Sequence, residues 1–136
     1  MIIGIGTDII EIGRIEKVFK GADRFLNRNF SKAEIEYFSK RNFKSETIAG
    51  AFSAKEAVSK ALGTGFRGFS LSDIEVLRTE LGKPFIKVSE KLENLILEMG
   101  IKNYKFHVSI SHSKENAIAY VILEGDVIEA FLRPNK

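Results

Sequence analysis

Two residues that can handle phosphate, and a turn that can approach it, lie within ten positions of one another. Glu56 and Lys60 are four residues apart, so they share one side of a predicted helix. The turn Gly63-Thr64-Gly65 follows directly, and its small residues let backbone N–H groups approach a phosphate. A carboxylate, an ammonium group and a glycine turn together suit metal-assisted phosphate chemistry. The plainer alternative is an ordinary ion pair worth about 0.3–0.5 kcal/mol, followed by a helix-ending glycine.

A third polar residue, Asp8, stands near the end of a hydrophobic strand predicted over residues 1–10. The strand alternates with a period of two, which places Gly4, Gly6 and Asp8 on one face. Glycine is unfavourable inside a strand, so two on one face indicate that something passes close to the backbone. An unpaired carboxylate buried there would be costly, so Asp8 needs a cation, a helix N-terminus or a lysine. The alternative is that Asp8 caps a helix beginning near Ile12.

Three segments that contain or follow these residues resemble motifs of the holo-acyl-carrier-protein synthases. Residues 6–15, Gly-Thr-Asp-Ile-Ile-Glu-Ile-Gly-Arg-Ile, resemble the opening motif of that family. Residues 52–65, Phe-Ser-Ala-Lys-Glu-Ala-Val-Ser-Lys-Ala-Leu-Gly-Thr-Gly, resemble its second motif. Residues 108–113, Val-Ser-Ile-Ser-His-Ser, match where the family has its late strand. Chain length and motif order agree as well, so the resemblance covers nearly the whole chain.

The resemblance implies a short, homotrimeric 4'-phosphopantetheinyl transferase that supports fatty acid biosynthesis. Such an enzyme moves phosphopantetheine from coenzyme A to a serine of apo-acyl carrier protein, releases adenosine 3',5'-bisphosphate and requires Mg²⁺. The family's catalytic and metal-binding carboxylates correspond to Asp8 and Glu56, and its catalytic lysine to Lys60. On the same resemblance, coenzyme A is expected to contact Lys60, Gly63, Thr64, Gly65, Lys83, Pro84, Ser111 and His112.

The chemistry of these residue types fits the implied roles. Mg²⁺ prefers oxygen ligands and usually takes one or two carboxylates together with waters and substrate phosphates. Asp8 and Glu56, on two different elements, meet that requirement. Either Glu56 or a metal-bound water can accept the serine proton, and Lys60 can stabilise the departing bisphosphate.

Charge placement favours an acidic protein partner. The first 68 residues hold 12 Lys/Arg against 8 Asp/Glu, whereas the chain as a whole is only at +3. If the segment is helical, one cationic stripe is formed by Arg14, Lys17, Lys20, Arg24 and Arg28. The resemblance implies that this region docks the acidic carrier protein, with Arg14 prominent and Lys17, Arg24 and Arg28 beside it. A solvated face is the alternative, and no zinc-ligand spacing or RNA-binding motif points to nucleic acid.

Composition bounds the architecture and the location. With 136 residues and 44% hydrophobic content, residues 1–136 are expected to form one domain. The absence of cysteine excludes disulfides and thiolate metal sites. The longest apolar stretches have the length of strands and no N-terminal signal pattern is seen, so a cytoplasmic protein without membrane attachment is expected.

The pattern predicts an α+β fold of the phosphopantetheinyl transferase type, with a mainly antiparallel sheet packed against a long helix. Short helices are expected near 12–20 and 22–28, and Ser31 with Glu34 predicts a capping box for a helix to Lys40. Ser45 is the expected N-cap of the long helix that ends at Gly63. Strands are expected at 71–78, 85–88, 104–111 and 117–123, and a helix between Ser89 and Met99. The tail from Gly125 is ambiguous.

Two positions depart from the family pattern. Ala51 replaces an arginine common in the family, and Leu81 replaces an asparagine before Gly-Lys-Pro. If the family's arginine contacts the nucleotide phosphates, another base must take its place here, and the candidates are Lys40, Arg41 and Lys44. We expect activity to be retained and coenzyme A affinity to be most affected. His107 is interpreted as structural or interfacial, whereas His112 is either a phosphate or ribose contact or a turn histidine without function.

Two other function classes remain open from the sequence. One is a pyrophosphohydrolase that uses the same metal pair and needs no carrier protein. The other is a non-catalytic basic module that binds acidic proteins or RNA. Turnover of coenzyme A or nucleotides without a carrier would indicate the hydrolase. Substitution Glu56→Ala separates the basic module from the transferase, because the module would be unaffected and the transferase should lose two or more orders of magnitude in rate.

Overall fold

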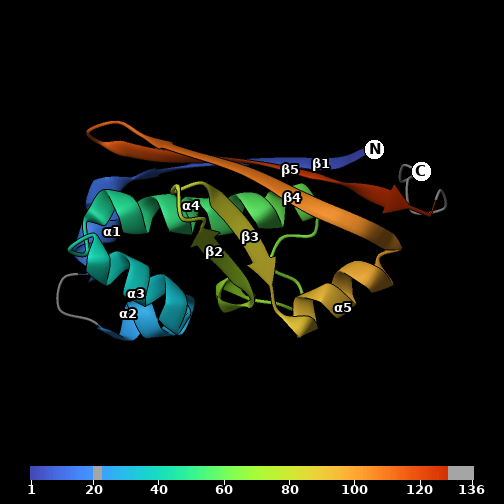
Figure 1. The fold of residues 1–136 in the computed structure, drawn as a ribbon, viewed down its shortest axis with the longest axis horizontal. Helices are drawn as coiled ribbons and strands as arrows, with labels where there is room; N and C mark the ends of the chain where they lie inside the picture. The colour runs from blue at the N-terminus through green and yellow to red at the C-terminus, as the bar shows by residue number, and fades with distance from the viewer. Residues whose placement is uncertain (20–22, 129–136) are drawn as a thin grey trace.

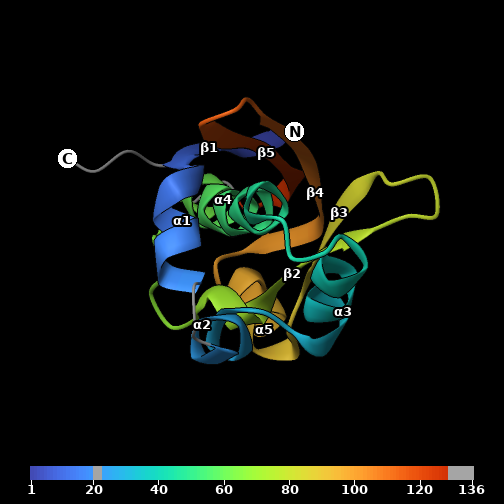
Figure 2. The same ribbon diagram turned by 90° about the vertical axis from the view of Figure 1, so that its left-hand side faces the viewer.

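The computed structural model describes residues 1–19 and 23–128 and has two layers (Figure 1). The elements follow one another as β1 (Ile2–Glu11), α1 (Ile12–Phe19), α2 (Asp23–Asn29), α3 (Lys32–Lys40), α4 (Ser45–Leu62), the 3-10 helix η1 (Leu71–Asp73), β2 (Ile74–Arg78), β3 (Pro84–Val88), α5 (Glu90–Glu98), β4 (Ile101–His112) and β5 (Asn116–Val127). The long sheet forms one layer, and helix α4 lies along one of its faces with α1 beside it (Figure 1, Figure 2). Helices α2, α3 and α5 and the β2–β3 hairpin lie beyond α4 and form the second layer. This arrangement confirms the predicted α+β class.

The long sheet is antiparallel, with strand order β1-β5-β4, and β2 and β3 form a separate two-stranded sheet. Strand β1 pairs with β5 from Ile2 opposite Glu124 to Glu11 opposite Asn116. The last two long strands are a hairpin, and both are longer than the sequence predicted. Strands β1 and β4 are therefore the two edges of this sheet.

The two glycines of β1 allow α4 to lie directly against the sheet. A Cβ atom on Gly4 would collide with the carbonyl oxygen of Ala61, and one on Gly6 with that of Ala57. The predicted close approach is confirmed, and the approaching group is the backbone of α4. The face of β1 that carries Asp8 is thereby brought against the helix that carries Glu56.

Helix α4 is buried on more sides than its apolar residues account for. Its alanines at 49, 51, 54, 57 and 61 are buried, but so are Ser53, Lys55 and Ser59. The Lys55 ammonium donates to Glu34 Oε1 at 2.8 Å and to the backbone oxygens of Asn29 at 2.6 Å and Leu71 at 3.2 Å. This ion pair, which the sequence analysis missed, joins α4 to the second layer.

Two details of the predicted boundaries are wrong. Lys44, not Ser45, precedes the first turn of α4, and it makes no side-chain cap. Residues 71–73 form a 3-10 turn and not a strand, because Ser70 and Asp73 bond reciprocally as a capping box. The capping box of Ser31 and Glu34 and the left-handed Gly63 that ends α4 are confirmed.

No element among residues 1–19 and 23–128 covers the second face of the long sheet, which is partly apolar. Ile5, Ile9, Ile118 and Tyr120 on this face are each 41–66% exposed. Of the ambiguous tail, Val127 closes β5 and Ile128 is half-exposed, whereas residues 129–136 lie outside the described residues. No helix in the described part of the chain is long and apolar enough to cross a membrane.

Candidate functional site

Asp8 is held between β1 and α4 by two donors. Ser53 Oγ donates to Asp8 Oδ2 at 3.0 Å, and Lys60 Nζ donates to Asp8 Oδ1 at 3.3 Å and to the Thr7 carbonyl at 3.0 Å. The Asp8 side chain is 16% exposed and that of Lys60 53%. Asp8 is not a helix cap, because β1 continues through Glu11 before α1 begins.

Glu56 lies close enough to Asp8 for the two charges to repel. Burial and the Asp8 carboxylate both raise the pKa of Glu56, and the Lys60 ammonium partly offsets them. Within the described residues, Lys60 makes its ion pair with Asp8 and not with Glu56. The interpretation of Glu56 and Lys60 as a simple surface ion pair is therefore wrong. We call Asp8, Glu56 and Lys60 the acid–lysine cluster.

The donor set of this cluster fits Mg²⁺. Two carboxylates repel each other across a half-buried site, and a single lysine only partly compensates them. The residues described here include no group of three or more His, Cys, Asp and Glu that could hold a metal. Two carboxylates with positions left for water and phosphate is the arrangement that Mg²⁺ usually takes.

The glycine turn continues from the end of α4 that carries Lys60. Gly63 and Gly65 have φ of 78° and 64°, in the left-handed region that favours glycine. The Gly63 N–H already donates to the carbonyls of Ser59 and Lys60, so it closes the helix. The Thr64 hydroxyl donates to Gly65 O at 3.0 Å. The turn therefore adjoins Lys60.

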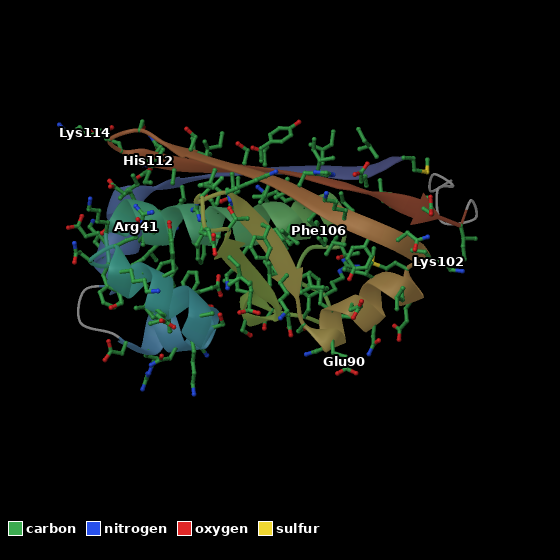
Figure 3. All side chains as sticks on the ribbon, in the orientation of Figure 1. Arg41, Glu90, Lys102, Phe106, His112 and Lys114 are labelled. Atoms are coloured by element: carbon green, nitrogen blue, oxygen red, sulfur yellow. The ribbon has the colours of Figure 1, made fainter. Side chains whose placement is uncertain are left out.

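A separate cavity of about 300 Å³ is rich in cationic side chains. Its lining residues come from α3, α4, β2, β4 and the connecting loops, and include Tyr37, Arg41, Lys44, Thr47, Arg78 and His112. The guanidinium groups of Arg41 and Arg78 each lie 5.4 Å from the centre of the Tyr37 ring. Arg41 and His112 are seen at the same end of the molecule in Figure 3. We call this space the cationic cavity.

The cavity bears on the two departures from the family pattern. Arg41 and Lys44, two of the three candidate bases, line it, whereas Lys40 pairs with Glu36 on the surface at 3.7 Å. Ala51 is buried in the core, and the side chain of Leu81 is 99% exposed.

The remaining predicted coenzyme A contacts lie apart from the glycine turn. Lys83 is exposed in the turn between β2 and β3, and Pro84 begins β3. Gly82, beside Lys83, lines the cationic cavity, and so does His112. Ser111 lines a second cavity of about 290 Å³ with Ile9 and Ile118, on the uncovered face of the sheet, and His112 lines this cavity as well.

The acid–lysine cluster and the cationic cavity share no residue and lie toward opposite edges of the sheet. Asp8 belongs to edge strand β1, whereas Ile110 and His112 of the cavity belong to the other edge strand, β4. Viewed along α4, β1 and α1 lie on one side and β4, α3 and β3 on the other (Figure 2). The acid–lysine cluster and the cationic cavity are therefore two separate sites in one copy of the chain.

The basic residues of the first half lie on two helices and not on one. Arg14 and Lys17 are exposed on α1, and Arg24 and Arg28 are exposed on α2. Helix α1 is described to Phe19 and α2 from Asp23, and Lys20 of the predicted stripe lies outside the described residues. His107 is on the uncovered face of the sheet, where its Nε2 lies 2.6 Å from Glu124 Oε1.

Sequence reasoning missed Ser53, Tyr37 and Arg78. A serine among the alanines of a buried helical face was a usable signal for Ser53, because a buried hydroxyl needs a partner. Nothing local marks Tyr37 and Arg78, which meet only because α3 packs against β2. Their pairing follows from tertiary structure.

Comparison with known proteins gives one consistent result. A sequence profile of the 4'-phosphopantetheinyl transferase superfamily matches residues 4–121. A holo-[acyl-carrier-protein] synthase of Clostridium beijerinckii is 58% identical over 124 residues, which cover 91% of this chain and 98% of the relative. The crystal structure of the holo-[acyl-carrier-protein] synthase of Neisseria meningitidis has a TM-score of 0.81 at 34% identity, covering 91% and 99% of the two chains. That of Bacillus anthracis, in complex with CoA (3',5'-ADP), has a TM-score of 0.75 at 41% identity, covering 93% and 99%.

Proposed function

The chain belongs to the 4'-phosphopantetheinyl transferase superfamily, and from this membership we propose that it is a holo-acyl-carrier-protein synthase. It transfers the phosphopantetheine of coenzyme A to a serine of apo-acyl carrier protein, depends on Mg²⁺ and releases adenosine 3',5'-bisphosphate. Residues 1–136 act as one transferase domain that serves fatty acid biosynthesis in the cytoplasm.

The observation that carries this proposal is the meeting of Asp8 and Glu56 beside Lys60. Residues 48 positions apart in the chain converge because the glycines of β1 admit α4. The repulsion between the two carboxylates supports a cation between them. The Asp8 and Glu56 carboxylates would hold Mg²⁺, which supplies charge neutralisation of the pyrophosphate.

The side chains of the acid–lysine cluster account for the remaining chemistry. The serine oxygen forms a bond to the β-phosphorus of coenzyme A, and the bond from that phosphorus to the bridging oxygen breaks. Burial and the Asp8 charge raise the pKa of Glu56, which makes it a stronger proton acceptor than an ordinary glutamate, and Glu56 takes the serine proton. Lys60, whose ammonium is half-exposed, reaches the phosphates and stabilises the departing bisphosphate.

We propose that the cationic cavity binds the nucleotide part of coenzyme A. Three permanently or readily charged bases, Arg41, Lys44 and Arg78, surround a space of about 300 Å³ next to His112. Phosphate groups are recognised by guanidinium forks of this kind. The crystallised relative from Bacillus anthracis binds CoA, which supports the same ligand class here. Lys83, Pro84 and Ser111 would contribute from the rim, and Gly63, Thr64 and Gly65 from beside Lys60.

A homotrimer would join the acid–lysine cluster and the cationic cavity. The uncovered sheet face exposes Ile5, Ile9, Ile118 and Tyr120, which favours burial against another copy. A contact between the β1 side of one copy and the β4 side of the next is heterologous, and such contacts form a ring when the rotation between neighbouring copies closes, here after three copies. Each site in the ring would then take the acid–lysine cluster from one copy and the cationic cavity from its neighbour.

The basic residues of α1 and α2 are the proposed docking surface for the carrier protein. Arg14, Lys17, Arg24 and Arg28 are exposed and carry positive charge into solvent. Charge complementarity with an acidic partner raises the rate of encounter and fixes orientation.

Mass spectrometry of intact apo-acyl carrier protein tests the proposal directly. The carrier is incubated with this protein, coenzyme A and Mg²⁺, and a parallel sample contains EDTA. A gain of one phosphopantetheine in the first sample only supports transfer. Cleavage of coenzyme A without modification of the carrier would instead indicate a pyrophosphohydrolase, and binding without either reaction would indicate a basic module.

A further inference from the structure

Ser53 is a fully buried serine among the apolar residues of α4. Its side chain has no exposed surface, and the neighbouring Ala54 and Ala57 are equally buried. A hydroxyl group in such surroundings is unfavourable unless it forms a hydrogen bond. The residue therefore needs a specific partner.

The partner of Ser53 lies on another element, whereas the second buried serine of the helix bonds locally. Ser59 Oγ donates to the Glu56 carbonyl, three residues earlier, at 2.8 Å. This local bond is the usual one for serine inside a helix. Ser53 Oγ instead donates to Asp8 Oδ2 at 3.0 Å, across the contact between α4 and β1.

The two restraints on the Asp8 carboxylate differ in stiffness. Lys60 holds Oδ1 at 3.3 Å from the end of a long, half-exposed side chain, which can move away. Ser53 holds Oδ2 from a short side chain on a packed helix. Ser53 is therefore the fixed restraint on the rotation of the carboxylate.

Resting on the proposed function, we propose that Ser53 is a positioning residue that orients the Asp8 carboxylate for Mg²⁺. A ligand whose orientation is set before the ion binds loses less freedom on binding. Ser53 acts through Asp8 and does not touch the substrate. Its hydroxyl is expected to affect metal affinity more than turnover with saturating metal.

Binding of Mn²⁺ in the absence of coenzyme A tests this role. Free Mn²⁺ is titrated with the full-length protein and measured by electron paramagnetic resonance. Substitution Ser53→Ala is expected to weaken Mn²⁺ binding by about ten- to a hundredfold, the usual effect of losing a group that supports a metal ligand. The Mg²⁺ concentration for half-maximal activity should rise in parallel, with a much smaller change in kcat at saturating Mg²⁺.

Ser59→Ala is the matched control, because it removes another buried hydroxyl from the same helix. It should leave Mn²⁺ affinity unchanged. A second pair of variants compares Ser53→Thr with Ser53→Val. The two new side chains have nearly the same size, and only threonine keeps the hydroxyl group. The threonine variant should bind Mn²⁺ more tightly than the valine variant, even where both unfold at lower temperature than the wild type.

Two results would overturn the role of Ser53. In the first, Ser53→Ala binds Mn²⁺ as tightly as the wild type does. In the second, Ser53→Ala and Ser59→Ala weaken Mn²⁺ binding by the same factor. Failure of the wild type itself to bind Mn²⁺ is a different outcome. It would contradict the metal site of the proposed function and, with it, this inference.

Discussion

The ionised carboxylate of Glu56 opposes folding. Burial and the Asp8 charge raise its pKa above the usual 4.5. Between the usual and the raised pKa, the folded state binds more protons than the unfolded state, so the free energy of unfolding falls as pH rises. The loss of stability caused by ionised Glu56 is fully present above the raised pKa and absent well below 4.5.

Substitution Glu56→Gln is therefore expected to stabilise the protein at pH 7 in EDTA. The difference in melting temperature from the wild type should shrink as pH falls toward 4.5 and below. Thermal unfolding followed by circular dichroism at several pH values measures it. Glu36→Gln, which alters an exposed pair with Lys40, should change stability by no more than about 1 kcal/mol at any of these pH values. A constant advantage of Glu56→Gln at all pH values would contradict the explanation.

The same substitution should abolish most of the activity. Glu56→Gln removes a negative charge from the proposed metal site and the acceptor of the serine proton. We expect kcat to fall by about two to three orders of magnitude, as when other groups that stabilise transition-state charge are removed. Steady-state assay of carrier modification at saturating Mg²⁺ checks this, with Glu36→Gln retaining wild-type activity. Unchanged turnover would remove Glu56 from the site.

The contact between β1 and α4 brings the acid–lysine cluster together, and it depends on glycine. Substitution Gly6→Ala would place a methyl group against the backbone of α4 at Ala57, which cannot move aside as a side chain can. We expect a loss of at least about 1–3 kcal/mol in the free energy of unfolding, measured by urea denaturation. Gly13→Ala on α1 is the matched control, because its Cβ would meet nothing within 4 Å. It should be neutral or stabilise by about 0.4–1 kcal/mol.

The buried pair of Lys55 and Glu34 connects α4 to the second layer. Desolvation lowers the pKa of Lys55, while Glu34 counteracts that effect. Substitution Lys55→Met would leave Glu34 buried without its cation, at a cost of about 3–5 kcal/mol in urea denaturation. The double substitution Lys55→Met with Glu34→Gln should recover part of this loss. A double variant that is as unstable as the sum of the two single variants would show that the residues are not coupled.

The sequence predicted the features whose causes lie within a few residues, and it missed those that depend on packing between distant segments. Local sequence was enough to predict the close approach at the glycines of β1, the capping box of Ser31 and the end of α4 at Gly63. The pairing of Asp8 with Glu56 came from the family resemblance, since periodicity alone assigns each residue to a face and not to a partner. The meeting of Tyr37, Arg41 and Arg78 depends on the packing of α3 against β2, which no local pattern encodes.

At the scale of the whole molecule, the acid–lysine cluster and the cationic cavity lie toward opposite edges of one sheet, so the proposed activity should depend on assembly. Substitution Ile9→Glu places a charge on the uncovered sheet face, where the side chain is 66% exposed in a single copy. The fold of the single copy should be retained. Burial of that charge against a second copy would be unfavourable, so the variant is expected to be monomeric by light scattering.

Mixing two inactive variants tests whether each site is shared between copies. Asp8→Asn damages the acid–lysine cluster and leaves the cationic cavity intact. Arg78→Ala damages the cationic cavity and leaves the acid–lysine cluster intact. When equal amounts are unfolded and refolded together, a mixed ring contains contacts at which both contributing halves are wild-type. Random mixing in a cyclic assembly predicts recovery of about a quarter of wild-type activity. If each site belonged to a single copy, no combination would restore it, and the mixture would stay as inactive as its parts. Adding Ile9→Glu to both variants should prevent recovery, because copies that do not associate cannot complement each other.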